Sequence, residues 1–234
     1  MNLIEKAKLY GIEISVKQNE QFETYSKLLV EWNEKINLTA ITEENDIIDK
    51  HFIDSLLFLK SVDINDVKTL IDVGTGAGFP ALPLKIMYPH LEVTLLDGLN
   101  KRLKFLQIVA DELGLDVSCV HARAEEGGKN PELREKYDIA TARAVANMNT
   151  LSEYCMPFVK KAGKFVALKG PGLEQEVKKA DKAIEILGGQ IEKIDHYILP
   201  DKDKSERNIA VISKVKNTPL KYPRHGSQIK KSSL

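Results

Sequence analysis

The chain has 234 residues, with 34 lysines and arginines against 34 aspartates and glutamates, and 43% of its residues are apolar. This composition is typical of a globular protein and excludes a disordered or collagen-like chain. No run approaches the roughly 18 consecutive apolar residues of a membrane span, and the first residues lack the order of a signal peptide, so we expect a cytoplasmic protein. Cys119 and Cys155 have neither a CxxC nor a Cys/His spacing. We therefore expect free thiols and no metal site.

The balanced net charge hides an uneven distribution. From Arg207 to the last residue there are seven basic residues and no acidic one. A segment of this kind suits a polyanion, because each cation near a phosphate releases condensed counterions. The alternative is a solubilising tail, which charge alone favours.

Residues 1–62 are predicted to be helical. Ser15 and Gln18 form a capping-box pattern, and apolar side chains then recur at three- and four-residue steps as far as Ile36. Thr42 is predicted to cap a further helix with two glutamates in its first turn. We expect two or three packed helices, a helical cap, ahead of the rest of the chain.

From residue 68 onward, β-rich runs alternate with helical ones. This order predicts an α/β fold with a mostly parallel, doubly wound sheet of seven strands and helices on both faces. The last two strands are joined by only about ten residues, too few for a parallel crossover, so we expect them to form an antiparallel hairpin at one edge. The expected strands are 69–73, 92–96, 117–120, 137–142, 164–168, 191–199 and 209–212, and the expected helices are 80–88, 100–113, 147–161 and 173–187. We divide the chain into the helical cap at 1–62, a cofactor-binding domain at 63–215 and a basic tail at 216–234.

The loop after the first predicted strand carries the clearest chemical signal. Three alternating glycines precede a helix in the sequence Asp72-Val73-Gly74-Thr75-Gly76-Ala77-Gly78-Phe79-Pro80. Glycines here allow positive φ and a close approach of the backbone to a ligand. In a doubly wound sheet, ligands bind at the carboxyl ends of the strands, and Asp97 at the end of the second strand is placed as a ribose-binding acid.

Two cofactors compete for this loop. A dinucleotide site favours G-x-G-x-x-G with a pyrophosphate on the helix amino terminus, but this chain has G-x-G-x-G and an acid, Asp72, two residues before it. A carboxylate at that point repels a pyrophosphate and suits the ammonium and sulfonium groups of S-adenosylmethionine (SAM). The sequence therefore favours SAM over a nicotinamide. The structural alternatives are a strand-end cap for Asp72 and a helix cap for Asp97.

Two further segments follow the third and fourth strands. His121 to Glu125 lies where a doubly wound domain contacts adenine, and Arg143 ends the fourth strand, where a transferable methyl group is expected. The chain has neither the Asn/Asp-Pro-Pro-aromatic sequence of enzymes that methylate exocyclic amines nor a Pro-Cys nucleophile. The sequence therefore argues against amine methylation of adenine or cytosine.

Beyond these patterns, the chain resembles the ribosomal RNA small subunit methyltransferase G family, also called glucose-inhibited division protein B, over essentially its whole length. The segments that carry the resemblance are Trp32-Asn33, Asn37-Leu38-Thr39, His51, Asp54-Ser55-Leu56, Asp72 to Pro80, Arg123-Ala124-Glu125, Thr141-Ala142-Arg143-Ala144, Lys169-Gly170, Arg207-Asn208-Ile209 and Lys221-Tyr222-Pro223-Arg224. The resemblance implies a class I SAM-dependent methyltransferase fold, described as Rossmann-like. It also implies transfer of a methyl group to N7 of a guanine in 16S rRNA of the small ribosomal subunit.

The resemblance assigns cofactor contacts to Gly74, Phe79, Ala124, Glu125 and Arg143. Together with the residues of the glycine loop and its neighbouring strand, the expected cofactor-binding set is Asp72, Gly74, Gly76, Gly78, Phe79, Asp97, Ala124, Glu125 and Arg143. The chain departs from the family's pattern at two points, Ala81 after the glycine loop and His225 to Gln228 after the Pro-Arg pair, so RNA contacts are not carried beyond Arg224.

Guanine N7 has an in-plane lone pair and no proton, so its methylation requires alignment rather than a general base. We hypothesise that Arg143 orients the cofactor and the base, because an arginine fork matches the O6/N7 edge of guanine. A salt bridge to a neighbouring acid is the alternative role. The residues expected to contact RNA are Lys169, Arg207, Lys221 and Arg224.

His51, Asp54 and Ser55 are spaced to share one helical face, and we expect them to position the helical cap over the cofactor. We expect a monomer. Two other functions stay open from the residues alone: a SAM-dependent methyltransferase of a small molecule, and a non-catalytic RNA-binding assembly factor with the same fold.

Overall fold

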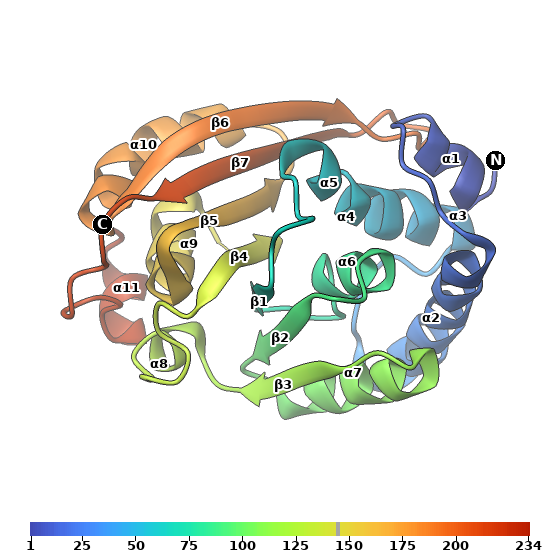
Figure 1. The fold of residues 1–234 in the computed structure, drawn as a ribbon, viewed down its shortest axis with the longest axis horizontal. Coiled ribbons are helices and arrows are strands. Elements are labelled where there is room, and N and C mark those ends of the chain that lie inside the picture. The colour runs from blue at the N-terminus through green and yellow to red at the C-terminus, as the bar shows by residue number, and fades with distance from the viewer. Residues whose placement is uncertain (144–145) are drawn as a thin grey trace.

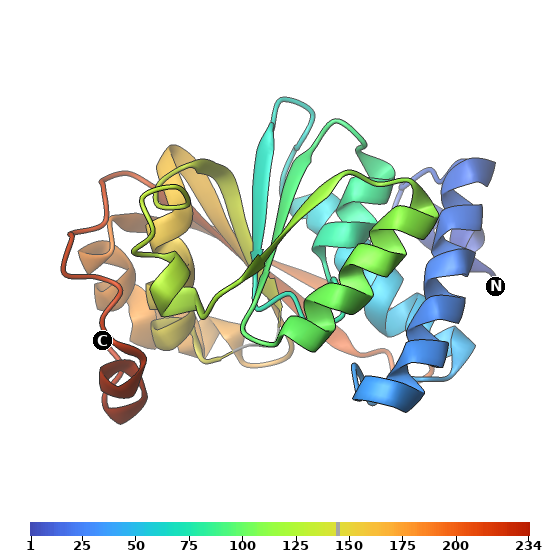
Figure 2. The same ribbon diagram turned by 90° about the horizontal axis from the view of Figure 1, so that it is seen from below.

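The computed structural model describes residues 1–143 and 146–234. A seven-stranded sheet in the order β3-β2-β1-β4-β5-β7-β6 runs through the molecule, with helices on both faces (Figures 1 and 2). The strands are β1 (Thr69–Val73), β2 (Glu92–Asp97), β3 (Val117–His121), β4 (Tyr137–Arg143), β5 (Val159–Lys169), β6 (Gly189–Ile198) and β7 (Glu206–Lys214).

The topology is the expected one. Strands β1 to β5 pair in parallel, and β7 runs antiparallel between β5 and β6. The predicted α/β fold with an antiparallel hairpin of the last two strands is therefore confirmed. Because β1 lies between β2 and β4, the order of strands reverses beside β1, and the glycine loop that follows it lies where ligands bind in such sheets.

Helices cover each face of the sheet with a separate apolar core. The cap, α6 and α7 pack on one face, and α8, α9 and α10 lie on the other (Figure 2). Consecutive residues of β1 serve both cores, with Leu70 in the first and Ile71 in the second, as the alternation of side chains along a strand requires. The helices are α1 (Leu3–Lys8), α2 (Val16–Ile36), α3 (Glu44–Ile47), η1 (Ile48–Ile53), α4 (Asp54–Leu56), α5 (Phe58–Ser61), α6 (Ala81–Met87), α7 (Asn100–Leu113), α8 (Ala124–Gly127), α9 (Met148–Cys155), η2 (Met156–Phe158), α10 (Leu173–Ile186) and α11 (Gly226–Lys231). Within the part of the chain that the structure describes, each helix is too short or too polar to cross a bilayer.

The helical cap follows its prediction at α2 and departs from it afterwards. Ser15 caps α2 in a complete capping box, and Asn37 ends the helix in the left-handed region with φ of 48°. Thr42 does not cap the next helix: α3 begins at Glu44, and its N-cap residue Glu43 makes no side-chain capping bond. The helix then continues as the π-helix η1, which the spacing of apolar residues does not reveal.

The predicted helix at 147–161 is too long. Helix α9 ends at Cys155, a 3₁₀ turn follows, and β5 already begins at Val159. Pro157 lies within that turn, and its missing N–H and fixed φ end a helix. The polar residues that follow it are the solvated start of a long strand.

The basic tail at 216–234 is packed against the body. The Arg134 guanidinium donates to the carbonyl oxygens of Gly128, Thr218 and Tyr222 at 2.7 to 2.9 Å. Tyr222 is buried, as is Ile229 in α11. These contacts attach the tail to the face of the sheet that carries α8 and α9.

We predict that Gly78→Ala destabilises the protein by about 2–4 kcal/mol, because φ is +98° there and a Cβ atom would lie 2.6 Å from the Tyr25 hydroxyl and within 2.8 Å of Leu82 and Leu106. Urea unfolding measures the change. Gly114→Ala is the matched control, since its φ is +64° with nothing within 4 Å, and it should cost only about 1 kcal/mol. Equal losses in the two variants would contradict this packing role.

Candidate active site

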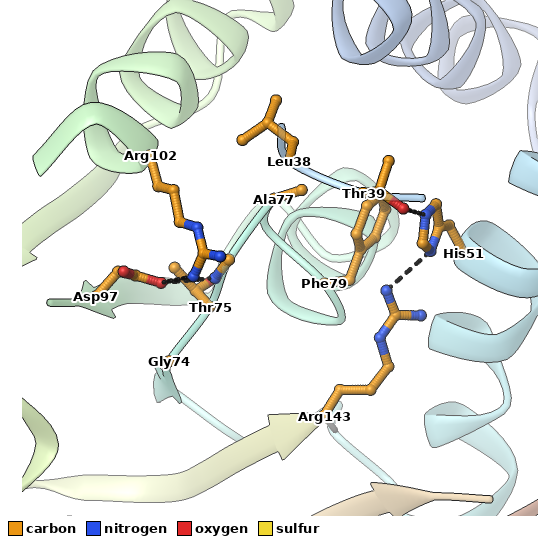
Figure 3. A pocket seen from close by; sticks show the side chains of 11 residues that line it. Leu38, Thr39, His51, Gly74, Thr75, Ala77, Phe79, Asp97, Arg102 and Arg143 are labelled. Atoms are coloured by element: carbon orange, nitrogen blue, oxygen red, sulfur yellow. Dashed lines mark hydrogen bonds and ion pairs between the residues drawn. The ribbon is translucent and has the colours of Figure 1, made fainter. Parts of the chain in front are cut away.

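A pocket of about 430 Å³ opens at the carboxyl ends of β1, β2 and β4 (Figure 3). Its volume is within the range of small-molecule sites. The helical cap, the glycine loop, α7 and the strand ends all contribute side chains to it. The lining residues are Leu38, Thr39, His51, Gly74, Thr75, Gly76, Ala77, Phe79, Asp97, Arg102 and Arg143.

The glycine loop exposes its backbone to this pocket. Gly74 and Gly76 have φ of +74° and +60°, a region that favours glycine. The Gly74 N–H donates to the Leu96 carbonyl oxygen at 2.8 Å, and the Gly76 N–H donates to Asp97 Oδ2 at 3.0 Å. The loop is therefore fastened to the end of β2, with the Asp97 carboxylate at the pocket wall.

Arg102 and Leu99 complete the surroundings of Asp97. The Arg102 guanidinium lies 3.3 Å from Asp97 Oδ2, and the Leu99 N–H donates to Oδ1 at 2.8 Å. The carboxylate thus has fixed partners on both oxygens. Arg102 was not among the predicted site residues, although its place in the first turn of the helix after β2 is a usable signal.

Asp72 lies beneath the loop and does not line the pocket. Its carboxyl is fully buried, and the Thr75 hydroxyl donates to its Oδ2 at 2.8 Å. Burial raises the pKa of Asp72 to about 7, against the lowering effect of the Thr75 hydrogen bond. Thr75 does line the pocket, so Asp72 supports the site from below.

Four side chains form a stack on the side of the pocket opposite Asp97. The Phe79 ring lies parallel to the His51 ring, with centroids 4.5 Å apart, and the Arg143 guanidinium carbon is 4.8 Å from the centre of the Phe79 ring. Tyr25 stacks on Phe79 at 5.2 Å. The stack joins residues of the helical cap, the glycine loop and β4, so it connects the cap to the sheet.

Hydrogen bonds fix the tautomer of His51. Arginine only donates, so the contact of 3.0 Å between Arg143 Nη2 and His51 Nδ1 makes Nδ1 an acceptor. Nε2 therefore carries the proton and donates to the Thr39 hydroxyl at 3.0 Å (Figure 3). Burial, and then the Arg143 charge, lower the pKa of His51 to about 3. The imidazole is neutral at physiological pH.

Asp54 joins two arginines from different strands. Its Oδ2 accepts from Arg143 of β4 at 2.9 Å, and its Oδ1 lies 3.2 Å from Arg207 Nε of β7. Arg143 also donates to the Lys50 carbonyl oxygen at 3.1 Å. The salt bridge considered as an alternative role for Arg143 is therefore present, and it holds the guanidinium at the pocket wall.

A second pocket of about 340 Å³ lies next to the first and shares His51 and Arg143 with it. Lys169 and Arg207, two of the residues expected to contact RNA, line it, and Lys50 adds another cation. Its lining is rich in basic groups, which suits an anionic or base-edge ligand. The complete lining is Ile41, Lys50, His51, Asp54, Arg143, Leu168, Lys169, Gly170 and Arg207.

Several predicted residues lie outside both pockets. Gly78 packs under the helical cap, and Ala124 and Glu125 are in α8. Lys221 is exposed in the tail, and Arg224 donates to both carboxylate oxygens of a buried acid, Glu153, at 2.9 and 2.7 Å. The charge of Arg224 is thus neutralised inside the fold. Ala144, which is part of the resemblance to the family, lies outside the described residues.

Among residues 1–143 and 146–234, no group of three His, Cys, Asp or Glu side chains is arranged to hold a metal ion. The two cysteines are free thiols, one half-buried and one buried. Burial raises the pKa of Cys155 well above its usual value, so this thiol is not activated as a nucleophile.

A family model and individual relatives of this chain carry the same family description. A family model named GidB, rRNA small subunit methyltransferase G, matches residues 18–209. The chain is 52% identical over 225 residues to ribosomal RNA small subunit methyltransferase G of Bacillus subtilis strain 168, covering 96% of this chain and 94% of that protein. It is 54% identical over 215 residues to the protein of the same name from Listeria innocua serovar 6a, covering 92% and 90%.

Comparison with solved structures supports the fold alone. The YcgJ protein from Bacillus subtilis aligns with a TM-score of 0.53 at 14% identity, covering 71% of this chain and 100% of that one. TrmN from Thermus thermophilus aligns with a TM-score of 0.54 at 17% identity, covering 70% and 48%.

We predict that the neutral, buried His51 makes the protein less stable in mild acid. The pKa of this group is about 3 in the folded protein and 6.5 when unconstrained, so the unfolded chain binds the proton first as the pH falls below 6.5. Lowering the pH from 7 to 5 should therefore remove about 2 kcal/mol of unfolding free energy through this group.

Urea unfolding of the unaltered protein and of His51→Gln at both pH values isolates this contribution. The variant is needed because the raised pKa of Asp72 gives a slope of opposite sign. If both proteins showed the same pH dependence, the imidazole would not be held neutral as described.

Proposed function

The chain belongs to the ribosomal RNA small subunit methyltransferase G family, and from this premise we propose that it methylates N7 of one guanine in 16S rRNA. That it is a SAM-dependent methyltransferase of 16S rRNA follows from the family. The finer assignment to N7 of guanine 527 is our proposal. We propose further that the protein acts as a cytoplasmic monomer on RNA of the small subunit.

The residues of the first pocket fit SAM. The positive φ of Gly74 and Gly76 keeps side chains away from the loop backbone, and the Asp97 carboxylate is an acceptor for ribose hydroxyls. When bound, SAM supplies a sulfonium-activated methyl group. We propose that Gly74, Gly76, Phe79, Asp97 and Arg143 hold it, with Asp72 and Gly78 supporting the loop from below. The assignments of Ala124 and Glu125 rest on the resemblance alone.

Arg143 is the residue we propose to position the target base. Its guanidinium is fixed by Asp54, the Lys50 carbonyl and His51 and borders both pockets. A pre-oriented fork of this kind can hold the O6 edge of guanine while N7 remains free to attack. His51 is neutral and uses both ring nitrogens in hydrogen bonds, which agrees with a reaction that needs alignment and no proton removal.

The second pocket is the proposed entrance for RNA. Lys169 and Arg207 line it beside Arg143, so a base entering there reaches the wall of the first pocket. This shared wall is the observation that carries the proposal. Lys221 and Arg224 stay as weaker candidates because neither lines one of the two pockets. Lys221 is exposed on the tail, and Arg224 is paired with the buried Glu153.

We predict that Arg143→Lys and Arg143→Ala each lower methyl transfer by about 100-fold or more, because misplacing the reacting groups by about 1 Å has an effect of that size. The assay follows tritium from methyl-labelled SAM into purified small subunits and identifies 7-methylguanosine in the RNA. Lys104→Ala, at an exposed position of α7, is the control and should keep normal activity. Full activity and full SAM affinity in both Arg143 variants would exclude the positioning role.

We predict that Lys169→Ala and Arg207→Ala each reduce the salt dependence of RNA binding, by at most about one unit in the slope of log K against log salt, since each removes one cation from the second pocket. Lys169 is ion-paired with Glu176 and Arg207 with Asp54, so part of each charge is already neutralised within the protein. Binding of a 16S rRNA fragment at several salt concentrations gives the slopes. Lys221→Ala in the same assay tests the tail. Unchanged slopes for both Lys169 and Arg207 variants would place the RNA elsewhere.

A further inference from the structure

A groove in the helical cap is separate from both pockets described above. It has a volume of about 730 Å³ and is lined by residues of α1, α2, α3 and η1, the elements at the right-hand edge of Figure 1. It contains no residue of the first or second pocket among the described side chains that line it. The proposed reaction therefore leaves this groove without a role.

The groove has an apolar floor. Leu3, Phe22 and Phe52 are buried beneath it, Ile48 is half-buried, and Val30 on α2 is 36% exposed. The rings of Phe22 and Phe52 are packed with their centroids 4.9 Å apart. A concave apolar surface of this size suits one or two apolar side chains of a partner.

The rim of the groove is acidic. Glu23, Glu31, Glu34 and Glu44 line it, all exposed, whereas Lys27 is the one basic side chain among the described lining residues. The surrounding sequence has the same sign, because residues 1–66 contain 13 acidic and 7 basic residues. RNA is repelled by such a surface and a cationic polypeptide is attracted to it.

We propose that this groove, hereafter the acidic groove, binds a lysine- and arginine-rich protein segment that inserts apolar side chains between the glutamates. The inference rests on the proposed function, because a small ribosomal subunit presents RNA-bound proteins beside its RNA, and proteins that neutralise phosphates are basic. The enzyme then contacts its particle on two surfaces of opposite charge: the basic second pocket meets RNA and the acidic groove meets protein.

Residues that line the acidic groove are adjacent in sequence to residues that line the candidate active site. Within η1, His51 lines the first pocket and the adjacent Phe52 lines the groove. Phe52 also packs against Phe79 of the glycine loop, with ring centroids 6.0 Å apart. A protein segment in the groove is therefore held close to the RNA that enters the second pocket, which raises the affinity for the assembled particle.

The test uses the full chain and a fluorescein-labelled synthetic peptide of lysine and arginine with leucine at every third or fourth position. The groove variant is Glu23→Gln/Glu34→Gln. The matched control is Glu20→Gln/Glu112→Gln, which removes the same charge from exposed positions of α2 and α7 outside the groove. Equal affinity of the variants for S-adenosylhomocysteine verifies that each is folded.

We expect the groove variant to bind the peptide about five- to tenfold more weakly than the control does. A peptide with serine in place of leucine should bind weakly to every protein. Methylation of intact small subunits should fall several-fold in the groove variant and stay normal in the control.

Three results would overturn the proposal. The first is equal binding of the leucine peptide by the groove variant and the control. The second is binding of the serine peptide to the unaltered protein as tightly as the leucine peptide, and the third is normal methylation of subunits by the groove variant. A dimer that dissociates in the groove variant would also overturn the proposal, because the occupant would then be a second copy of this chain. If the unaltered protein transferred no methyl group to RNA, the proposed function would fail, while the peptide measurements would still decide the groove.

Discussion

The arrangement of the site depends on the two salt bridges of the buried Asp54 carboxylate. It belongs to the helical cap, yet its partners Arg143 and Arg207 come from β4 and β7. This carboxylate is only 4% exposed, and removing either arginine partner from a buried ion pair is strongly destabilising. The two salt bridges therefore hold the cap to the sheet where the strands end. With Arg143 fixed in this way, His51 accepts a hydrogen bond from it and stays neutral. These contacts thus fix the positions of the cap, the glycine loop and the strand ends relative to one another, and the three together form the wall between the two pockets.

That wall divides two chemical environments. On one side the glycine loop and Asp97 form a pocket with an exposed backbone and one carboxylate. On the other, Lys50, Lys169 and Arg207 form a pocket in which cations predominate. A methyl donor and a polyanionic acceptor require such different surroundings, and a planar guanidinium is suited to the boundary because it presents hydrogen-bond donors without a transferable proton.

Much of this organisation is predictable from local sequence. Capping at Ser15, the glycine loop and the alternation of strands and helices each depend on residues that are neighbours in the sequence. These patterns were sufficient to predict the fold and the location of the site. Asp72 could not be predicted to lie under the loop, because its burial is decided by packing from both sides of β1. The π-helix at Ile48–Ile53 and the pairing of Arg224 with Glu153 likewise depend on contacts between residues distant in sequence.

The position of β7 has a consequence for how the chain is made. This strand is the last of the seven in sequence, yet it lies between β5 and β6 and bonds to both. While the protein emerges from a ribosome, β6 and the outer side of β5 have no strand to bond with until β7 has been synthesised. The nascent chain therefore exposes two unpaired edges, which are sites for wrong association, and a single late insertion closes both.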